Sequence, residues 1–198
     1  MMAHRFNPDH AERLLSEQRQ AMLPADRVLD ALALGGGMVF ADVGVGPGYF
    51  ALPAALRTGA TVYAVDVEPR MLERLRERVK TAGLSGQFAF LEGDACAVPL
   101  PDASVLRTLC SFVLHEVSDL SAAVSELARI TKPGGIVGLA EWEKIPANSG
   151  PPESVRLERR QLLSAVENIG FERVESVQLN AEQYLLVCHK PAHTSVGS

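Results

Sequence analysis

The stretch "ADVGVGPGYFA" at residues 41–51 decides the fold, because it follows a short apolar run and places a glycine at every second position. It fits two cofactor-binding patterns. The residues from Asp42 to Gly48 form D-x-G-x-G-x-G, whereas those from Gly46 to Ala51 form G-x-G-x-x-A, the fingerprint of dinucleotide-binding folds. The rest of the sequence is needed to decide which of these two cofactor-binding patterns applies.

Short apolar runs alternate with helical patterns between residues 38 and 142, which is typical of βαβ units in a parallel sheet. Two further runs within residues 171–190 are joined by a very short turn and can only pair antiparallel. The sequence therefore predicts an α/β fold with five parallel strands finished by a β-hairpin. The expected strands are 38–43, 61–66, 87–94, 104–114, 135–142, 171–180 and 182–190; the expected helices are 9–23, 25–34, 49–57, 69–83, 118–135 (with Ser118 as N-cap) and 154–170.

The length of 198 residues suits one domain, and 47% hydrophobic with 22% charged residues fits a folded soluble chain. We expect an N-terminal helical arm at 1–24, the main domain at 25–190 and a flexible tail at 191–198. The chain opens without a basic-then-apolar leader, and no apolar run approaches the roughly 18 residues of a membrane span. A cytoplasmic protein is therefore expected.

The charge and the cysteine content limit the kinds of partner and site that the sequence predicts. The net charge of -5, with Lys and Arg spread along the chain, argues against nucleic acid as a partner. Cys96, Cys110 and Cys188 stand at unrelated spacings, which predicts neither a disulfide framework nor a metal site. The oligomeric state stays open, a homodimer included.

Acidic residues follow three consecutive expected strands, at the edge where open parallel sheets bind their ligands. Asp66, about twenty residues past the glycine loop, can accept hydrogen bonds from both hydroxyls of a ribose, in NAD or in an adenosyl cofactor. Asp94 can accept from an exocyclic amine such as that of adenine. Each acid alone is equally well explained as a helix cap or turn. Together they predict an adenosine site.

The glycine loop itself is poorly suited to a pyrophosphate. Pro47 removes one backbone donor from the loop, and Asp42 places negative charge just before it. An acid suits an ammonium or a sulfonium, so S-adenosylmethionine is the predicted ligand. The alternative is an NAD(P)-dependent oxidoreductase that uses G-x-G-x-x-A, for which a Tyr-x-x-x-Lys pair or a second domain would be expected; the sequence has neither.

Five segments carry a resemblance to a known family: "DVGVGPGYF" (42–50), "VYAVDVEPRML" (62–72), "LEGDACAVPLPDASV" (91–105), "VLHEV" (113–117) and "ELARITKPGGIV" (126–137). In order and spacing these segments resemble class I S-adenosylmethionine-dependent methyltransferases, most closely the branch with the ubiquinone and menaquinone biosynthesis methyltransferases, over about residues 25–142. That family implies a Rossmann-like doubly wound sheet of seven strands, mostly parallel with an antiparallel last strand. It usually carries an acid where Leu106 and Arg107 stand here.

The resemblance assigns cofactor-binding residues. It implies that Asp42 and the glycine loop hold the methionine moiety and that Asp66 holds the ribose. Val67 would pack on the adenine, and Asp94 with Ala95 would meet its amine edge and ring. The complete cofactor set is Asp42, Gly44, Gly46, Gly48, Asp66, Val67, Asp94, Ala95 and Phe112.

Transfer from a sulfonium needs mainly that donor and acceptor atoms be held about 3–3.5 Å apart. His115 is the candidate base where the acceptor must lose a proton, and its alternative role is to orient the loop after the fourth strand. Glu141 is the second catalytic candidate, through polarising the acceptor. Trp142 and Phe6 are expected to line the substrate pocket. Because such transfer requires no obligatory catalytic residue, a non-catalytic S-adenosylmethionine-binding protein is a further alternative.

Overall fold

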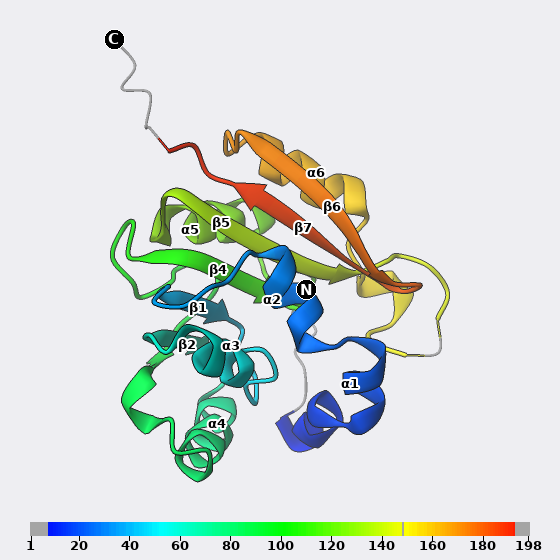
Figure 1. Ribbon diagram of the computed structural model, residues 1–198. Coiled ribbons are helices and arrows are strands. Elements are labelled where there is room, and N and C mark those ends of the chain that lie inside the picture. Colours follow the sequence, from blue (N-terminus) through cyan, green and yellow to red (C-terminus); the bar gives the residue numbers. More distant parts are fainter. Residues whose placement is uncertain (1–7, 148, 193–198) are drawn as a thin grey trace.

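A seven-stranded sheet of order β3-β2-β1-β4-β5-β7-β6 forms the centre of the computed structural model, which describes residues 8–147 and 149–192 (Figure 1). Only β7 runs against its neighbours, pairing antiparallel with both β5 and β6. The predicted sheet of mostly parallel strands with an antiparallel last strand is confirmed. The strands are β1 (Phe40–Val43), β2 (Val62–Asp66), β3 (Phe88–Glu92), β4 (Val105–Ser111), β5 (Thr131–Trp142), β6 (Arg173–Asn180) and β7 (Gln183–His189).

Helices cover both faces of this sheet. In Figure 1, α2 and α3 lie in front of the sheet, and α5 and α6 lie behind it. Neighbouring residues of β1 belong to two different buried apolar clusters: Phe40 packs with α2, α3 and α4, whereas Ala41 packs with α5 and α6. Because both faces of the sheet are covered, the strands are formed by continuous apolar runs rather than by alternating apolar and polar residues. The helices are α1 (Glu17–Met22), α2 (Ala25–Ala31), α3 (Ala51–Thr58), α4 (Pro69–Thr81), α5 (Leu120–Ile130) and α6 (Arg159–Glu167), with 3-10 helices η1 (Pro8–Leu15), η2 (Ser85–Gln87) and η3 (Glu153–Val155).

The expected helix at 118–135 is wrong at both ends. Asp119, not Ser118, is the N-cap, and its carboxylate accepts a hydrogen bond from the Ala122 N–H at 2.9 Å. At the other end β5 already begins at Thr131. The Thr131 hydroxyl donates to the Leu127 carbonyl at 2.7 Å, so one residue closes the helix and opens the strand.

Other boundaries also shift from the predicted ones. The fourth strand ends at Ser111, before 114, because Phe112 adopts a left-handed φ of 59° and turns the chain. The helix expected at 9–23 is divided at Ser16, whose side chain caps α1. The helix expected at 154–170 is reduced to α6, which begins after a capping box of Glu158 and Gln161.

Arg107 stands where the resembling family usually has an acid, and it is buried. Its Nε donates to the Leu32 carbonyl at 2.7 Å, and another guanidinium nitrogen donates to the Leu106 carbonyl at 2.9 Å. The departure therefore anchors the C-terminal end of α2 to β4. In the described part of the chain, no helix has the length and apolar character needed to cross a bilayer.

Gly44 and Gly37 test how closely the glycine loop is packed. Both have φ near 75°, but a Cβ at Gly44 would lie 2.2 Å from Val113 Cγ2, whereas one at Gly37 would meet nothing within 4 Å. We expect Gly37→Ala to lower the free energy of unfolding by about 1 kcal/mol through backbone strain, and Gly44→Ala by about 1–3 kcal/mol more through overpacking. Urea denaturation measures both, and equal losses would contradict the close approach.

Candidate cofactor and acceptor site

The glycine loop begins the candidate site at the carboxyl end of β1. Gly44, Gly46 and Gly48 all have positive φ. A Cβ at Gly48 would lie 2.2 Å from Leu75 Cδ1, just as one at Gly44 would clash with Val113. The loop is therefore pressed against its neighbours on two sides, and side chains are excluded at these positions for steric reasons.

Asp42 lies at the end of β1 just before this loop and is almost fully buried. Its Oδ1 has no hydrogen-bond partner among the described residues. Burial, with a smaller contribution from the charge of Asp66, raises the pKa of Asp42 to about 8. A buried acceptor without a donor is costly unless a ligand supplies one. Asp42 thus fits a cationic or hydrogen-bond-donating group.

Asp66 ties the glycine loop to the end of β2. Its Oδ2 accepts from the Gly46 N–H at 2.8 Å, and its Oδ1 accepts from the Glu68 N–H at 2.9 Å. Burial raises the pKa of Asp66, against the opposing effect of these backbone hydrogen bonds. Because each carboxylate oxygen has a further lone pair, Asp66 can hold the loop and still accept from a ligand. The tether to Gly46 was not predicted from the sequence.

Val67, Asp94 and Ala95 follow β2 and β3 at the same edge of the sheet, since Asp66 is in register with Glu92. Val67 is a large apolar side chain with 40% of its surface exposed. Ala95 is buried, and the exposed Asp94 accepts from the Cys96 N–H at 2.8 Å. The structure thus brings the residues predicted to surround an adenosine to one place.

His115 and Glu141 form a buried pair that sequence reasoning treated as two separate candidates. His115 Nδ1 lies 3.1 Å and 3.0 Å from the two Glu141 carboxylate oxygens, which also accept from the backbone N–H groups of His115 and Trp142. Burial opposes protonation, but the hydrogen bond and charge of Glu141, with the charge of Glu116, raise the pKa of His115 overall. The pair joins the ends of β4 and β5.

Aromatic and arginine side chains cover the neighbouring region. The rings of Phe112 and Trp142 lie 5.4 Å apart between centroids, and the Arg156 guanidinium lies 5.2 Å from the Trp142 ring centroid. Arg156 also donates to the backbone carbonyls of Glu143, Ile145, Ser149 and Pro151. It therefore shapes the loop that follows β5. Nothing in the sequence marked this arginine, and Phe6, the other expected pocket residue, lies outside the described residues.

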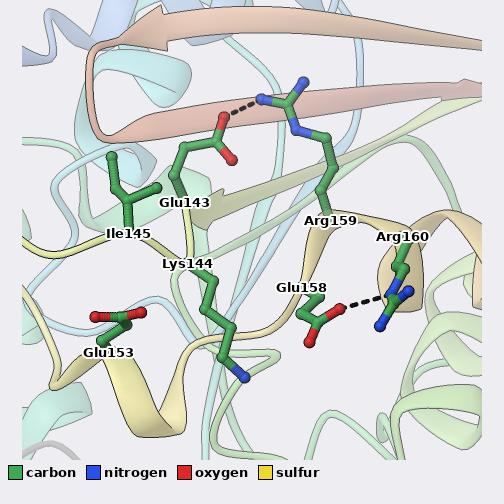
Figure 2. Close-up of a pocket in the computed structure, with 7 residues that line it drawn as sticks. All are labelled: Glu143, Lys144, Ile145, Glu153, Glu158, Arg159 and Arg160. Atoms are coloured by element: carbon green, nitrogen blue, oxygen red, sulfur yellow. Dashed lines mark hydrogen bonds and ion pairs between the residues drawn. The ribbon is translucent and has the colours of Figure 1, made fainter.

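An open surface hollow of about 510 Å³ lies beside the same loop (Figure 2). Its charges are largely paired within it: Arg159 binds Glu143, and Arg160 Nε lies 2.6 Å from the Glu158 carboxylate. None of the strand-end acids lines it, so it is not the cofactor site. Within residues 8–147 and 149–192, no group of three or more His, Cys, Asp or Glu side chains could hold a metal ion. The lining residues are Glu143, Lys144, Ile145, Glu153, Glu158, Arg159 and Arg160.

Comparison with known proteins identifies the family. Residues 41–139, half of the chain, match the model of a family described as a methyltransferase domain. The chain belongs to this family. Its fold is similar to a crystal structure of an S-adenosylmethionine-dependent methyltransferase from Aquifex aeolicus, with a TM-score of 0.86 and 26% identity over 93% of this chain and 99% of that one.

Two curated proteins show more limited similarity. An uncharacterized protein of Mycobacterium tuberculosis is 36% identical over 124 residues, which cover 62% of this chain and 44% of that protein. A malonyl-[acyl-carrier protein] O-methyltransferase of Serratia marcescens is 41% identical over 96 residues, covering 48% of this chain and 35% of that protein. The match thus spans less than half the length of both relatives.

Fold and family together define a class I S-adenosylmethionine-dependent methyltransferase domain. The predicted class is confirmed, and S-adenosylmethionine is the methyl donor of that class. Asp42, with an unpaired carboxylate oxygen before the glycine loop, fits this positively charged cofactor better than a pyrophosphate.

Glu141→Gln tests the buried histidine pair. Because the folded-state pKa of His115 is raised, the ion pair stabilises the protein fully below the unfolded pKa of about 6.5, and this stabilisation is lost as pH rises through the folded pKa. We expect the variant to lose about 3 kcal/mol at pH 6 and clearly less at pH 8.5. Urea denaturation at both pH values gives the stability, and NMR titration of His115 should show a lower pKa in the variant.

Glu175→Gln is the matched control. Glu175 contacts His189 Nε2 at 2.9 Å but is 43% exposed, so removing its charge should cost much less stability than Glu141→Gln and should do so at either pH. A loss for Glu141→Gln that is equally small, or that does not depend on pH, would contradict the proposed ion pair.

Proposed function

We propose that this protein transfers the methyl group of S-adenosylmethionine to a small-molecule acceptor by direct in-line displacement. The observation that carries the proposal is the buried Asp42 carboxylate, whose Oδ1 is unpaired among the described residues, beside a glycine loop in a methyltransferase-family fold. When bound, the cofactor supplies a methyl group already activated on a sulfonium. The chain's own task is therefore to position and desolvate the reactants.

The cofactor roles follow from which groups have free bonding capacity. Asp42 would hold the positively charged methionine end, and the remaining lone pairs of Asp66 would accept from the ribose hydroxyls. Val67 offers an exposed apolar surface on which a flat base would pack, and Ala95 and Asp94 would meet its ring and its amine edge. Gly44, Gly46 and Gly48 would keep the loop close to the ligand.

His115 acts best as a positioning residue in this proposal. Its Nδ1 is engaged by Glu141, and its Nε2 lies 3.7 Å from a Glu116 carboxylate oxygen. A side chain so enclosed is poorly placed to exchange protons with solvent. It fixes the loop that carries Phe112, and Glu141 in turn fixes the backbone N–H of Trp142.

The acceptor is proposed to be small, aromatic or isoprenoid in character. The rings of Phe112 and Trp142 support this, because they offer an apolar wall at the ends of β4 and β5. The motif resemblance supports a place in the ubiquinone and menaquinone methyltransferase-like branch. The net charge of -5 makes nucleic acid an unfavourable partner.

Calorimetry distinguishes the proposal from its alternatives. S-adenosylmethionine should bind and NADH should not, whereas an oxidoreductase would show the reverse. Labelled methyl donor, supplied with a panel of quinols, phenols, amines and thiols, then separates an enzyme from a non-catalytic binding protein. Binding without transfer to any acceptor class would favour the non-catalytic alternative.

The Asp42→Asn variant tests whether Asp42 binds the cofactor, because binding should remove the proton from the Asp42 carboxyl group. With the pKa of Asp42 near 8, most unliganded molecules carry this proton at pH 7. A cation placed beside Asp42 favours the ionised form, so cofactor binding should release nearly one proton. Calorimetry in buffers of different ionisation enthalpy measures this release. Asp42→Asn should abolish it and weaken binding about tenfold or more.

Asp30→Asn serves as the control for this measurement. Asp30 is an exposed acid that pairs with Arg57 at 2.6 Å and belongs to no part of the candidate site. Proton release and affinity should match the unmodified chain. Proton release that persists in Asp42→Asn would exclude Asp42 as its source.

A further inference from the structure

Arg19, on α1 of the N-terminal segment, is a second charged group beside the glycine loop that has no ionic partner among the described residues. Its guanidinium carbon lies 5.0 Å from the ring centroid of Tyr49 and 5.1 Å from that of Phe112. Its Nε is buried and has no hydrogen-bond partner among the described residues. Burial also lowers the pKa of Arg19. A partly desolvated guanidinium between two aromatic rings, with its Nε–H unpaired among the described residues, can still donate a hydrogen bond to an anion.

The segment that carries Arg19 is docked on the site through several contacts. The Tyr49 hydroxyl donates to the Leu23 carbonyl at 2.5 Å, and Asn180 donates to the Met22 carbonyl at 3.2 Å. On the other side of Arg19, η1 reaches α4 through an Arg74 to Glu12 ion pair at 3.5 Å. These contacts hold α1, and with it Arg19, beside Tyr49 and the glycine loop.

The same segment covers the glycine loop directly. A Cβ at Gly46 would lie 3.7 Å from Leu14 Cδ1, which is ordinary van der Waals contact. Tyr49 follows the loop by one residue and its ring contacts Arg19, so the Arg19 guanidinium lies beside the loop. The loop therefore has the buried Asp42 carboxylate before it and the half-buried Arg19 guanidinium beside it, and neither has an ionic partner among the described residues.

This pair of opposite charges matches an amino-acid zwitterion. Asp42 suits an ammonium group, and a guanidinium is the side chain best suited to a carboxylate, which it binds through two parallel N–H donors. We propose that Arg19 binds the α-carboxylate of the cofactor, so that the N-terminal segment itself completes the cofactor site. This inference rests on the proposed function, because it assigns a further contact within the same site.

The competing interpretation is that Arg19 only packs between two rings. Cation–π contacts of this kind stabilise by about 0.5–2 kcal/mol and require no ligand. That interpretation predicts the same effect of an Arg19 substitution on every ligand of the site. A comparison of ligands that differ only in the carboxylate therefore separates the two.

Arg19→Met provides the test, with S-adenosylmethionine and decarboxylated S-adenosylmethionine as the two ligands in calorimetry. The variant should bind S-adenosylmethionine about 10- to 100-fold more weakly, as expected for a lost charge-assisted hydrogen bond. Its affinity for the decarboxylated ligand should change less than about twofold. A loss of equal size for both ligands, or for neither, overturns the proposal; the latter result would also be found if Arg19 served a carboxylate on the acceptor.

Two further variants keep the test conclusive. Arg13→Met removes an exposed arginine from the same segment and should leave both affinities unchanged. Arg19→Lys retains the charge with a less suitable geometry and should partly restore the preference for the carboxylate-bearing ligand. If Arg19→Lys shows no such preference, the positive charge at position 19 does not account for binding of the carboxylate. An unmodified chain that binds neither ligand defeats the proposed function, whereas one that binds both with equal affinity defeats only the role of Arg19.

Discussion

The close approach of the glycine loop to its neighbours is the constraint on which the site depends. Gly44 and Gly48 have positive φ, and their Cα atoms face Val113 and Leu75 with no room for a side chain. Val113 belongs to the segment after β4, and Leu75 belongs to α4. The loop is therefore fixed from both sides, and its third glycine, Gly46, is held by Asp66. A ligand that follows this loop is positioned relative to β1, β2 and β4 at once.

Two buried carboxylates at the same edge of the sheet, Glu141 and Asp42, differ in how many hydrogen bonds the protein provides for them. Glu141 accepts from the side chain of His115 and from two backbone N–H groups, so its bonding capacity is used within the protein. Asp42 is equally buried, yet its Oδ1 has no partner among the described residues, and its pKa is raised to about 8. A satisfied buried acid stabilises structure, whereas an unsatisfied one costs stability unless a ligand completes it. This contrast separates a structural acid from a ligand-binding one.

The sequence could predict the features that depend on local pattern. The strand-end acids and the glycine loop follow from alternating apolar runs, because parallel strands bring their carboxyl ends to one edge. The pairing of His115 with Glu141 could not be predicted, since it depends on the register of β4 against β5, in which Ser111 lies opposite Ala140. The end of α5 was misplaced because Thr131 serves both helix and strand. Arg19 carried no local signal either, since its environment comes from Tyr49 and Phe112.

Phe112 is the residue at which these separate features meet. Its left-handed backbone is unfavourable for a bulky side chain, and such a conformation persists only when the surroundings enforce it. Here its N–H donates to the Ala140 carbonyl at 2.8 Å, and its ring contacts both Trp142 and Arg19. Ending β4 in this way turns the chain where the Phe112 ring contacts both Arg19 and Trp142. The strain at Phe112 is thus the local cost of joining the N-terminal segment to the aromatic wall.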